Sequence, residues 1–187
     1  MINFDYGVEL GPLRDENAGR YYQARNNHAI WKWCRQYDII QVGQHVNWLQ
    51  NVTSDTSKIR MYEVVDSQQE LLGVCGLTDI DYINRRAEFS LYILPEHHKK
   101  GFGRKALKTL FKHGFYNLGL NSIWGETYEG NPAFHLFKSL GMTHEGTRDE
   151  FYYRNGKFID AHLVSLTRAS FDDVEKTWPK IKLRRIK

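Results

Sequence analysis

Cysteine, proline and long apolar runs are all scarce in this chain of 187 residues. Only two cysteines occur, Cys34 and Cys75, so neither a disulfide-stapled scaffold nor a cysteine-based zinc site is expected. Reduced thiols are typical of a cytoplasmic protein, and we expect that location. No run approaches the roughly 20 consecutive apolar residues of a membrane-spanning helix. Residues 1–5 lack the features of a signal peptide, so a membrane partner is not expected.

The four prolines stand singly, and no repeat or low-complexity segment suggests a linker. The length fits one domain with a sizeable core. A hydrophobic fraction of 41% and a charged fraction of 26% are typical of a globular protein. We therefore expect a single domain over residues 1–168, followed by a C-terminal helix and a basic tail over residues 169–187.

The net charge is positive, but the positive charge is unevenly distributed. There are 26 Lys and Arg residues against 22 Asp and Glu residues, a formal net charge of +4, which would suit an anionic partner such as nucleic acid. The segments 99–105 and 176–187 hold many of the basic residues and no acid. The remainder is therefore net acidic and suits a cationic amine. Nucleic acid is not favoured, because no signature of a nucleic-acid-binding module is present.

The apolar periodicity predicts an α/β domain with a mixed sheet. The expected strands cover residues 6–10, 61–65, 71–77, 87–94, 121–128, 143–153 and 158–167. The expected helices cover residues 14–33, 41–52, 103–116 and 131–141. The dipeptide Asn155-Gly156 between the last two strands is a strong hairpin signal. The strand 87–94 alternates apolar and polar side chains, so it has one polar face.

A basic, glycine-containing loop, His98–Arg104, joins the strand 87–94 to the following helix. Backbone N–H groups at a helix N-terminus lack internal partners and attract anions. The loop's glycines let a phosphate approach the backbone closely, and its basic side chains add positive charge. The spacing fits neither a P-loop nor a dinucleotide-binding motif, in which Ala106 would have to be glycine. A glycine turn with solvated lysines is the alternative interpretation of the loop alone.

The order of strand, basic Gly-x-Gly loop, helix, strand and Asn-initiated helix resembles the GNAT superfamily of acetyl-CoA-dependent N-acetyltransferases. The superfamily's Gln/Arg-x-x-Gly-x-Gly/Ala motif is matched by residues 98–103, with His98 at the first position. Its later Asn-containing motif is loosely matched by Asn131–Met142. The resemblance covers roughly residues 6–168. It implies the GNAT fold, a mixed sheet of six to seven strands flanked by helices, in which splayed parallel strands form the acetyl-CoA cleft.

Two branches of the superfamily are suggested by short motifs in the second half of the chain. Glu145–Arg148 and Asn155–Ala161 look like the RimJ/RimL branch, whose members acetylate protein N-termini. Arg85–Phe89, together with Pro95-Glu96, looks like the spermidine acetyltransferases. These motifs leave both a protein N-terminus and a polyamine or similar small amine open as acceptors.

A third branch is suggested by the N-terminal part of the chain. Arg25-Asn26, followed by His45 and Trp48, is similar to the amino-sugar nucleotide acetyltransferases. An amino-sugar nucleotide therefore stays open as the third acceptor class. The oligomeric state is also open, although homodimers are common in the superfamily.

The resemblance implies acetyl-CoA as the co-substrate and a defined set of contacts to it. Three strand residues would pair through their backbone with the pantetheine arm, the basic loop would hold the pyrophosphate, and residues after position 130 would line the opposite side. The implied residues are Leu91, Tyr92, Ile93, His98, Lys99, Lys100, Gly101, Phe102, Gly103, Arg104, Asn131, Phe134 and Phe137. No metal is expected, because His97-His98 has no further ligand at metal-binding spacing.

Two carboxylates are candidates for the general base that removes a proton from the attacking amine. Glu88 lies on the polar face of the strand before the loop, and Glu126 lies on the following strand. Family members carry the base at one position or the other. With both carboxylates pointing at one cleft, we expect repulsion between the like charges to make one of them a stronger proton acceptor.

One departure from the superfamily concerns the acid that protonates the departing CoA thiolate. The tyrosine that often does so falls at Phe137, which has no proton to give. Either water or another side chain protonates the thiolate, or the thiolate leaves unassisted. This departure keeps open a second function, that of a GNAT-like module that binds acetyl-CoA or CoA without turnover.

Overall fold

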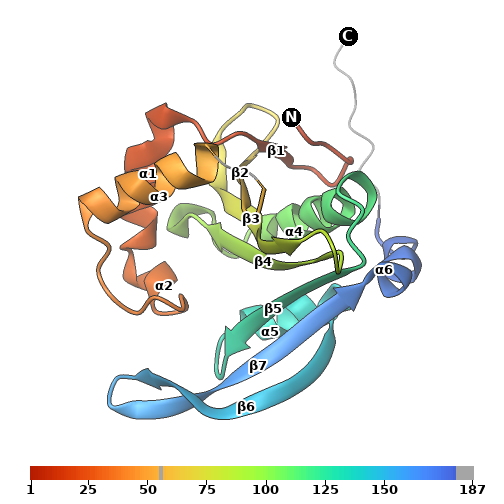
Figure 1. Ribbon diagram of the computed structural model, residues 1–187. Coiled ribbons are helices and arrows are strands. Elements are labelled where there is room, and N and C mark those ends of the chain that lie inside the picture. The colour runs from red at the N-terminus through yellow and green to blue at the C-terminus, as the bar shows by residue number, and fades with distance from the viewer. Residues whose placement is uncertain (55–56, 180–187) are drawn as a thin grey trace.

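A seven-stranded mixed sheet forms the centre of the molecule in the computed structural model, which describes residues 1–54 and 57–179 (Figure 1). The strand order is β1-β2-β3-β4-β5-β7-β6. Neighbouring strands are antiparallel except β4 and β5, which are parallel. The strands are β1 (Glu9–Gly11), β2 (Arg60–Val65), β3 (Leu71–Asp81), β4 (Arg86–Ile93), β5 (Ser122–Tyr128), β6 (Thr143–Arg154) and β7 (Lys157–Thr167).

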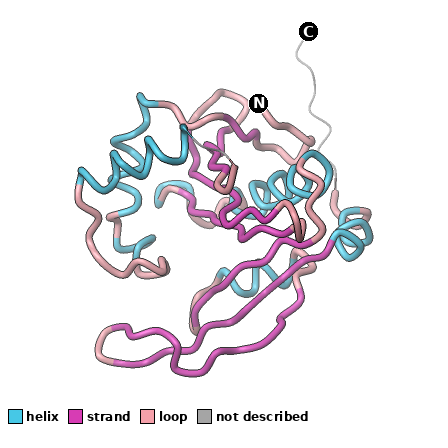
Figure 2. Tube along the Cα trace, in the orientation of Figure 1, coloured by secondary structure: helices cyan, strands magenta, loops and turns pink. Residues whose placement is uncertain are grey.

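Helices cover both faces of this sheet, as the trace in Figure 2 shows. Their bounds are η1 (Asp15–Asn17), α1 (Ala18–Arg25), α2 (His28–Trp31), α3 (Val42–Ser54), η2 (Pro95–His97), α4 (Phe102–Lys112), the π-helical turn η3 (His113–Asn117), α5 (Ala133–Ser139) and α6 (Arg168–Glu175). No helix in the described part of the chain is long and apolar enough to cross a membrane. The expected mixed sheet of six to seven strands flanked by helices is confirmed.

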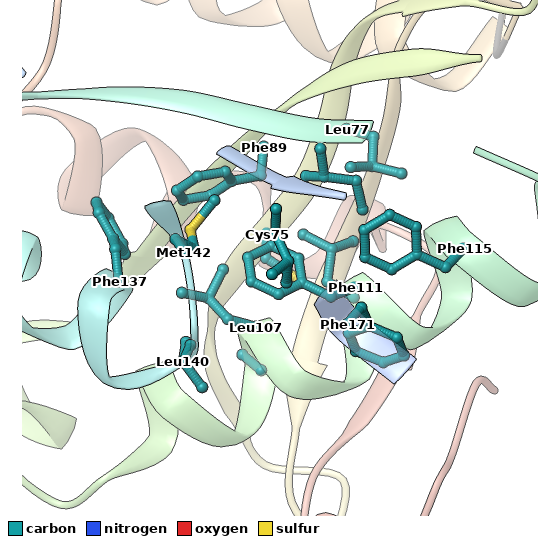
Figure 3. Close-up of a cluster of buried hydrophobic side chains, with 14 of the residues drawn as sticks. Cys75, Leu77, Phe89, Leu107, Phe111, Phe115, Phe137, Leu140, Met142 and Phe171 are labelled. Carbon is teal, nitrogen blue, oxygen red and sulfur yellow. The ribbon is translucent and has the colours of Figure 1, made fainter. Parts of the chain in front are cut away.

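Two apolar clusters hold the layers together, one on each face of the sheet. Val74 and Cys75, adjacent in β3, point to opposite faces and belong to different clusters. Val74 packs with α1 and α2, whereas Cys75 packs with α4 and the C-terminal half of the chain. In the larger cluster, Phe111 and Phe115 are fully buried, and Phe171 of α6 lies 4.9 Å from the Phe115 ring (Figure 3).

The parallel strands β4 and β5 diverge after a short paired region. Their pairing runs from Arg86↔Ser122 to Glu88↔Trp124 and then stops. At the next position the ring of Phe89 lies directly against Gly125, where a Cβ would come within 2.8 Å of the ring atom Cδ1. The expected splayed parallel strands are therefore present. The lack of a side chain at Gly125 is what lets the Phe89 ring lie between them.

Several element boundaries differ from the sequence expectation for local reasons. The expected helix over residues 14–33 is divided into three short helices, and Asn27 starts the last of them by accepting a hydrogen bond from Ala29 N at 2.9 Å. β3 continues to Asp81 because it keeps pairing with β4 across a register shift. α5 begins at Ala133, and Asn131 Oδ1 still accepts from the Ala133 N–H at 3.0 Å.

The C-terminal part of the chain begins with the expected helix. α6 starts at Arg168, and its Phe171 is completely buried in the larger apolar cluster. Most of the expected basic tail, residues 180–187, lies outside the described residues. The division of the chain at residue 168 stays a prediction.

Candidate active site

A cavity of about 700 Å³ opens where β4 and β5 diverge. β4 and the start of α4 line one side, and β5 and α5 line the other. The segment from Arg25 to Gln36, which contains α2 and the start of the loop after it, closes one end. The cavity therefore brings together three segments that are far apart in the sequence.

Most residues predicted for catalysis or cofactor binding meet in this cavity. Those that line it are Glu88, Leu91, Tyr92, Ile93, His98, Lys99, Gly101, Phe102, Gly103, Arg104, Glu126, Asn131 and Phe137. Lys100 is exposed and Phe134 lines a smaller neighbouring cavity of about 260 Å³, where its ring lies 4.8 Å from that of His162. These two side chains are therefore placed away from the main cavity, and the roles of the others stay predictions.

The basic loop has the backbone conformation that an anion site at the start of α4 requires. Gly101 adopts a φ of 81° and Lys99 a φ of 61°, both in the left-handed region. Lys105 N–H bonds to Gly101 O, so the N–H groups of residues 102–104 have no partner within the helix. A Cβ on Gly103 would meet side-chain carbons at 3.5–3.7 Å, an ordinary contact distance. Gly101 is thus required for conformation, whereas Gly103 is not.

His98, which replaces the Gln or Arg of the superfamily motif, has a role within the protein. Its Nε2 lies 2.7 Å from the carbonyl oxygen of Ile93, at the end of β4. Because a carbonyl only accepts, Nε2 donates this hydrogen bond. It fixes the loop to the end of β4, and this ring nitrogen is not free for a phosphate.

Glu88 and Glu126 face each other across the diverging strands, and a guanidinium lies between them. Arg35 Nη2 donates to Glu88 Oε1, and Arg35 Nη1 donates to Glu88 Oε2 at 3.4 Å. Arg35 Nε lies 3.7 Å from Glu126 Oε1. The side chains of Glu88 and Glu126 are 9% and 4% exposed, so this cation serves two buried carboxylates at once.

The remaining contacts of the two carboxylates differ. Thr78 Oγ1 lies 3.4 Å from Glu88 Oε2, and the side chain of Arg35 provides the charged contact. Glu126 also accepts from Tyr152 OH at 2.6 Å and from Arg148 Nη1 at 3.1 Å. Arg35 and Arg148 therefore place positive charge beside the two carboxylates, and the expected effect of one carboxylate on the other stays a prediction.

Tyr92 and Tyr128 line the cavity, whereas Phe137 offers no hydroxyl group. The Phe137 ring lies 4.9 Å from that of Phe89 and closes the apolar side. Tyr92 OH is buried and has no hydrogen-bond partner among the described residues. Burial raises the pKa of Tyr92 and of Tyr128 above the usual tyrosine range, so both hydroxyl groups keep their protons.

Sequence reasoning missed Arg35 and assigned Arg25 only by resemblance. Arg25 lines the cavity, and its Nε is buried without a hydrogen-bond partner among the described residues. One sequence signal could have indicated Arg35: it lies two residues after the tryptophan-rich segment Trp31-Lys32-Trp33. His45 and Trp48, which together with Arg25 resembled the amino-sugar nucleotide branch, stack on each other within α3 at 5.4 Å. His45 Nε2 donates to Ala18 O, so His45 joins α3 to α1.

A comparison with family models matches residues 8–143 to an acetyltransferase (GNAT) domain. The chain belongs to the GNAT acetyltransferase family. The expected acyltransferase is thereby confirmed at the level of the family. Among the residues that the structure describes, no cluster of three or more His, Cys, Asp or Glu side chains could hold a metal ion.

The similar proteins of known name include spermidine acetyltransferases. A spermidine N(1)-acetyltransferase of Vibrio cholerae is 34% identical over 113 residues, 60% of this chain and just under two thirds (65%) of that relative. The enzyme of that name from Escherichia coli K12 is 27% identical over 92% of both chains. A crystal structure of the V. cholerae spermidine N-acetyltransferase with CoA and spermine has a TM-score of 0.82 and 27% identity, covering 88% of this chain and 98% of that one.

These relatives do not support the RimJ/RimL branch that two motifs suggested. The structure gives a physical reason why those motifs carry little information about the branch. Asn155 and Gly156 have φ values of 50° and 80°, the conformation of a tight hairpin turn. Glu145 accepts a hydrogen bond from Ser165 Oγ at 2.6 Å across the β6–β7 pair. These three residues therefore serve the hairpin itself, whereas Arg148 of the first motif contacts Glu126 and the Asn155 side chain contacts Tyr37.

Proposed function

We propose that this protein transfers the acetyl group of acetyl-CoA to a primary amine of the polyamine class. The observation that carries the proposal is the buried pair Glu88 and Glu126, which already holds one organic cation at the point where β4 and β5 diverge. An ammonium group offers the same charge and hydrogen-bond donors as the guanidinium that is there now. The names of the relatives from V. cholerae and E. coli support a polyamine as the acceptor.

Acetyl-CoA fits the remainder of the cavity. The unpaired edge of β4 offers backbone groups to the pantetheine arm, and the N-terminus of α4 offers N–H groups to the pyrophosphate. The side chains of Lys99 and Arg104 line this part of the cavity and add positive charge. The CoA-bound structure of the V. cholerae relative supports this co-substrate.

The contacts of the two carboxylates suggest separate roles for them. With an acceptor amine in place of Arg35, Glu126 would keep its bonds from Arg148 and Tyr152 and stay a fixed anion that orients the ammonium. Glu88 would keep only the distant Thr78 hydroxyl among its side-chain contacts. Glu88 is therefore the proposed general base, acting directly or through a water molecule.

The reaction then needs few protein groups. Glu88 takes a proton from the bound ammonium, and the freed amine attacks the thioester carbonyl carbon to give a tetrahedral intermediate. As the intermediate collapses, the carbon–sulfur bond breaks and the nitrogen gives its second proton to water, which releases the CoA thiolate and the neutral acetylated amine. Phe137 supplies no proton, so the thiolate takes one from water or from a hydroxyl group of the cleft.

Thiol release from acetyl-CoA tests the proposal. The wild-type protein is incubated with a thiol-reactive dye and with spermidine, spermine, an amino-sugar nucleotide or a peptide with a free N-terminus, and spermidine or spermine should give the highest kcat/KM. Glu88→Gln should lower kcat by about 10²–10⁴-fold, the range for loss of a general base. Glu126→Gln, the matched control, should act mainly on the KM of the amine.

Three results would contradict parts of this proposal. Retention of kcat within a few-fold in Glu88→Gln would exclude Glu88 as the base. A preference for the nucleotide or the peptide would exclude the polyamine class. Tight binding of acetyl-CoA with no thiol release for any amine would favour the non-catalytic module, the second candidate, which the phenylalanine at position 137 supports.

A further inference from the structure

A side chain of the protein itself occupies the place proposed for the acceptor ammonium. Arg35 contacts both Glu88 and Glu126, and no other cation among the described residues pairs with both of them. Any cationic acceptor that uses these carboxylates must therefore replace the guanidinium. The Arg35 guanidinium therefore competes with the acceptor for Glu88 and Glu126 in every molecule of the protein.

The backbone that carries Arg35 is held in place, whereas its side chain can leave. Arg154 Nη2 donates to the carbonyl oxygens of Cys34 and Arg35 at 3.3 and 3.1 Å. Tyr37 OH donates to Asn155 Oδ1 at 2.8 Å. The loop is thus attached to the β6–β7 hairpin at two points, but the Arg35 side chain is 54% exposed. A rotation of this side chain into solvent would vacate the carboxylates without moving the loop.

We propose that Arg35 limits the affinity for cationic acceptors by competing with them for the ammonium subsite formed by Glu88 and Glu126. This inference rests on the proposed function. A tethered group has an effective concentration in the millimolar range, so an acceptor with one ammonium must outcompete a guanidinium that is always at hand. An acceptor with several ammonium groups can replace both carboxylate contacts and gains the advantage of multivalent binding. Because the guanidinium must leave before either kind of acceptor binds, it lowers the affinity of monoamines and polyamines by the same factor, and the multivalent polyamine keeps the higher affinity.

The same exchange would couple acceptor binding to the availability of the base. While Arg35 is in place, its guanidinium donates to both oxygens of Glu88. Once an acceptor has displaced it, Glu88 faces the ammonium whose proton it must remove. Glu88 is thus paired with Arg35 in the empty site, and it becomes available as the base once the acceptor has displaced Arg35.

The opposite interpretation makes an opposite prediction. If Arg35 bound an anionic group of the acceptor, as an amino-sugar nucleotide would offer, its removal would weaken acceptor binding. If Arg35 competes with the acceptor, its removal strengthens binding. The sign of the change in KM therefore separates the two interpretations.

The test compares Arg35→Ala with Arg86→Ala, because Arg86 is also an exposed arginine paired with a carboxylate, that of Asp81, but does not line the cavity. KM and kcat are measured for spermidine and for butylamine, a monoamine. Arg35→Ala should lower the KM of butylamine and that of spermidine by a similar factor, about tenfold, as release from a tethered competitor predicts. Arg86→Ala should leave both KM values unchanged.

Calorimetric titration of spermine into the CoA-saturated protein gives a readout that does not depend on turnover. Arg35→Ala should bind spermine more tightly than the wild type, and Arg35→Gln, which keeps a polar side chain without the positive charge, should do the same if the alanine variant folds poorly. Tighter spermine binding without any thiol release would uphold the competitor role and overturn the proposed function. Thiol release by the wild type together with an unchanged or weaker affinity in both variants would overturn the competitor role alone.

Discussion

Adding one methyl group at Gly125 tests whether the divergence of β4 and β5 depends on the packing of Phe89. A Cβ at this position would lie 2.8 Å from Phe89 Cδ1 and 2.9 Å from Cζ, and closer still to Cε1. Carbon atoms in real structures do not approach this closely, so the ring must shift. Phe89 is confined by Phe111 at 5.5 Å and Phe137 at 4.9 Å between ring centroids, and it lines the cavity.

The expected cost follows from two opposing effects. Overpacking of a well-filled core costs about 1–3 kcal/mol. Replacing glycine by alanine in a strand interior returns about 0.5–1 kcal/mol, because the unfolded chain loses conformational freedom. Gly125→Ala should therefore lower the free energy of unfolding by up to about 2.5 kcal/mol, and a displaced Phe89 ring should raise the KM for acetyl-CoA.

Urea unfolding followed by tryptophan fluorescence measures the change, with the m-value used to check that the transition keeps its character. Gly146→Ala is the matched control, because Gly146 also lies in a strand and nothing lies within 4 Å of its added Cβ. Gly146→Ala should be neutral or slightly stabilising. In the double variant, Phe89→Leu should relieve the clash, so the two changes should not be additive.

The reasoning is refuted if Gly125→Ala is as stable as Gly146→Ala and leaves the KM for acetyl-CoA unchanged. It is also refuted if the effects of Gly125→Ala and Phe89→Leu add, because independent effects would mean that the added methyl group does not meet the ring. Either result would show that the divergence of the strands does not depend on this contact.

Two further predictions concern the basic loop and a buried histidine. Gly101→Ala should raise the KM for acetyl-CoA, because alanine costs roughly 1–2 kcal/mol in the left-handed conformation that residue 101 adopts. Gly103→Ala should change this KM little, and equal effects in the two variants would contradict the prediction. Burial, assisted by the charge of Arg60, lowers the pKa of His113 to about 4, so the unfolded state binds a proton first as the pH falls. The free energy of unfolding should therefore decrease between about pH 6.5 and 4, by about 2 kcal/mol from this group. In urea titrations across this range His113→Gln should show a smaller decrease, and an unchanged pH dependence would contradict the assignment.

Local patterns were sufficient to predict the central sheet and the start of α4. The turn at Asn155-Gly156 and the loop with Gly101 depend on backbone conformations that particular residues favour, and these are visible in the sequence. The division of the N-terminal helices was not predicted, because the hydrogen bond from Ala29 N to Asn27 Oδ1 competes with a continuous helix only in its structural context. Boundaries were therefore less predictable than the order of the elements.

The candidate site was predictable where it rests on one segment and unpredictable where distant segments meet. Glu88 and Glu126 could be identified because each has a fixed position relative to the basic loop or to Asn131. Arg35 lies 53 and 91 positions from its two carboxylate partners, in a loop without periodicity. Its location depends on Arg154, near the other end of the chain, and no local pattern contains that information.

The way in which Arg154 holds the loop after α2 bears on how this cleft can change during evolution. Arg154 holds the loop by donating to the backbone carbonyl oxygens of Cys34 and Arg35, a group that every amino acid possesses. The Arg154 guanidinium also lies 4.5 Å from the Tyr37 ring centroid. Mutation of the side chain at position 35 therefore leaves the attachment intact. Substitutions can therefore change the side chain that faces Glu88 and Glu126, while the backbone of position 35 stays where Arg154 holds it. A family with this arrangement can acquire new acceptors by single substitutions, without rebuilding the loop.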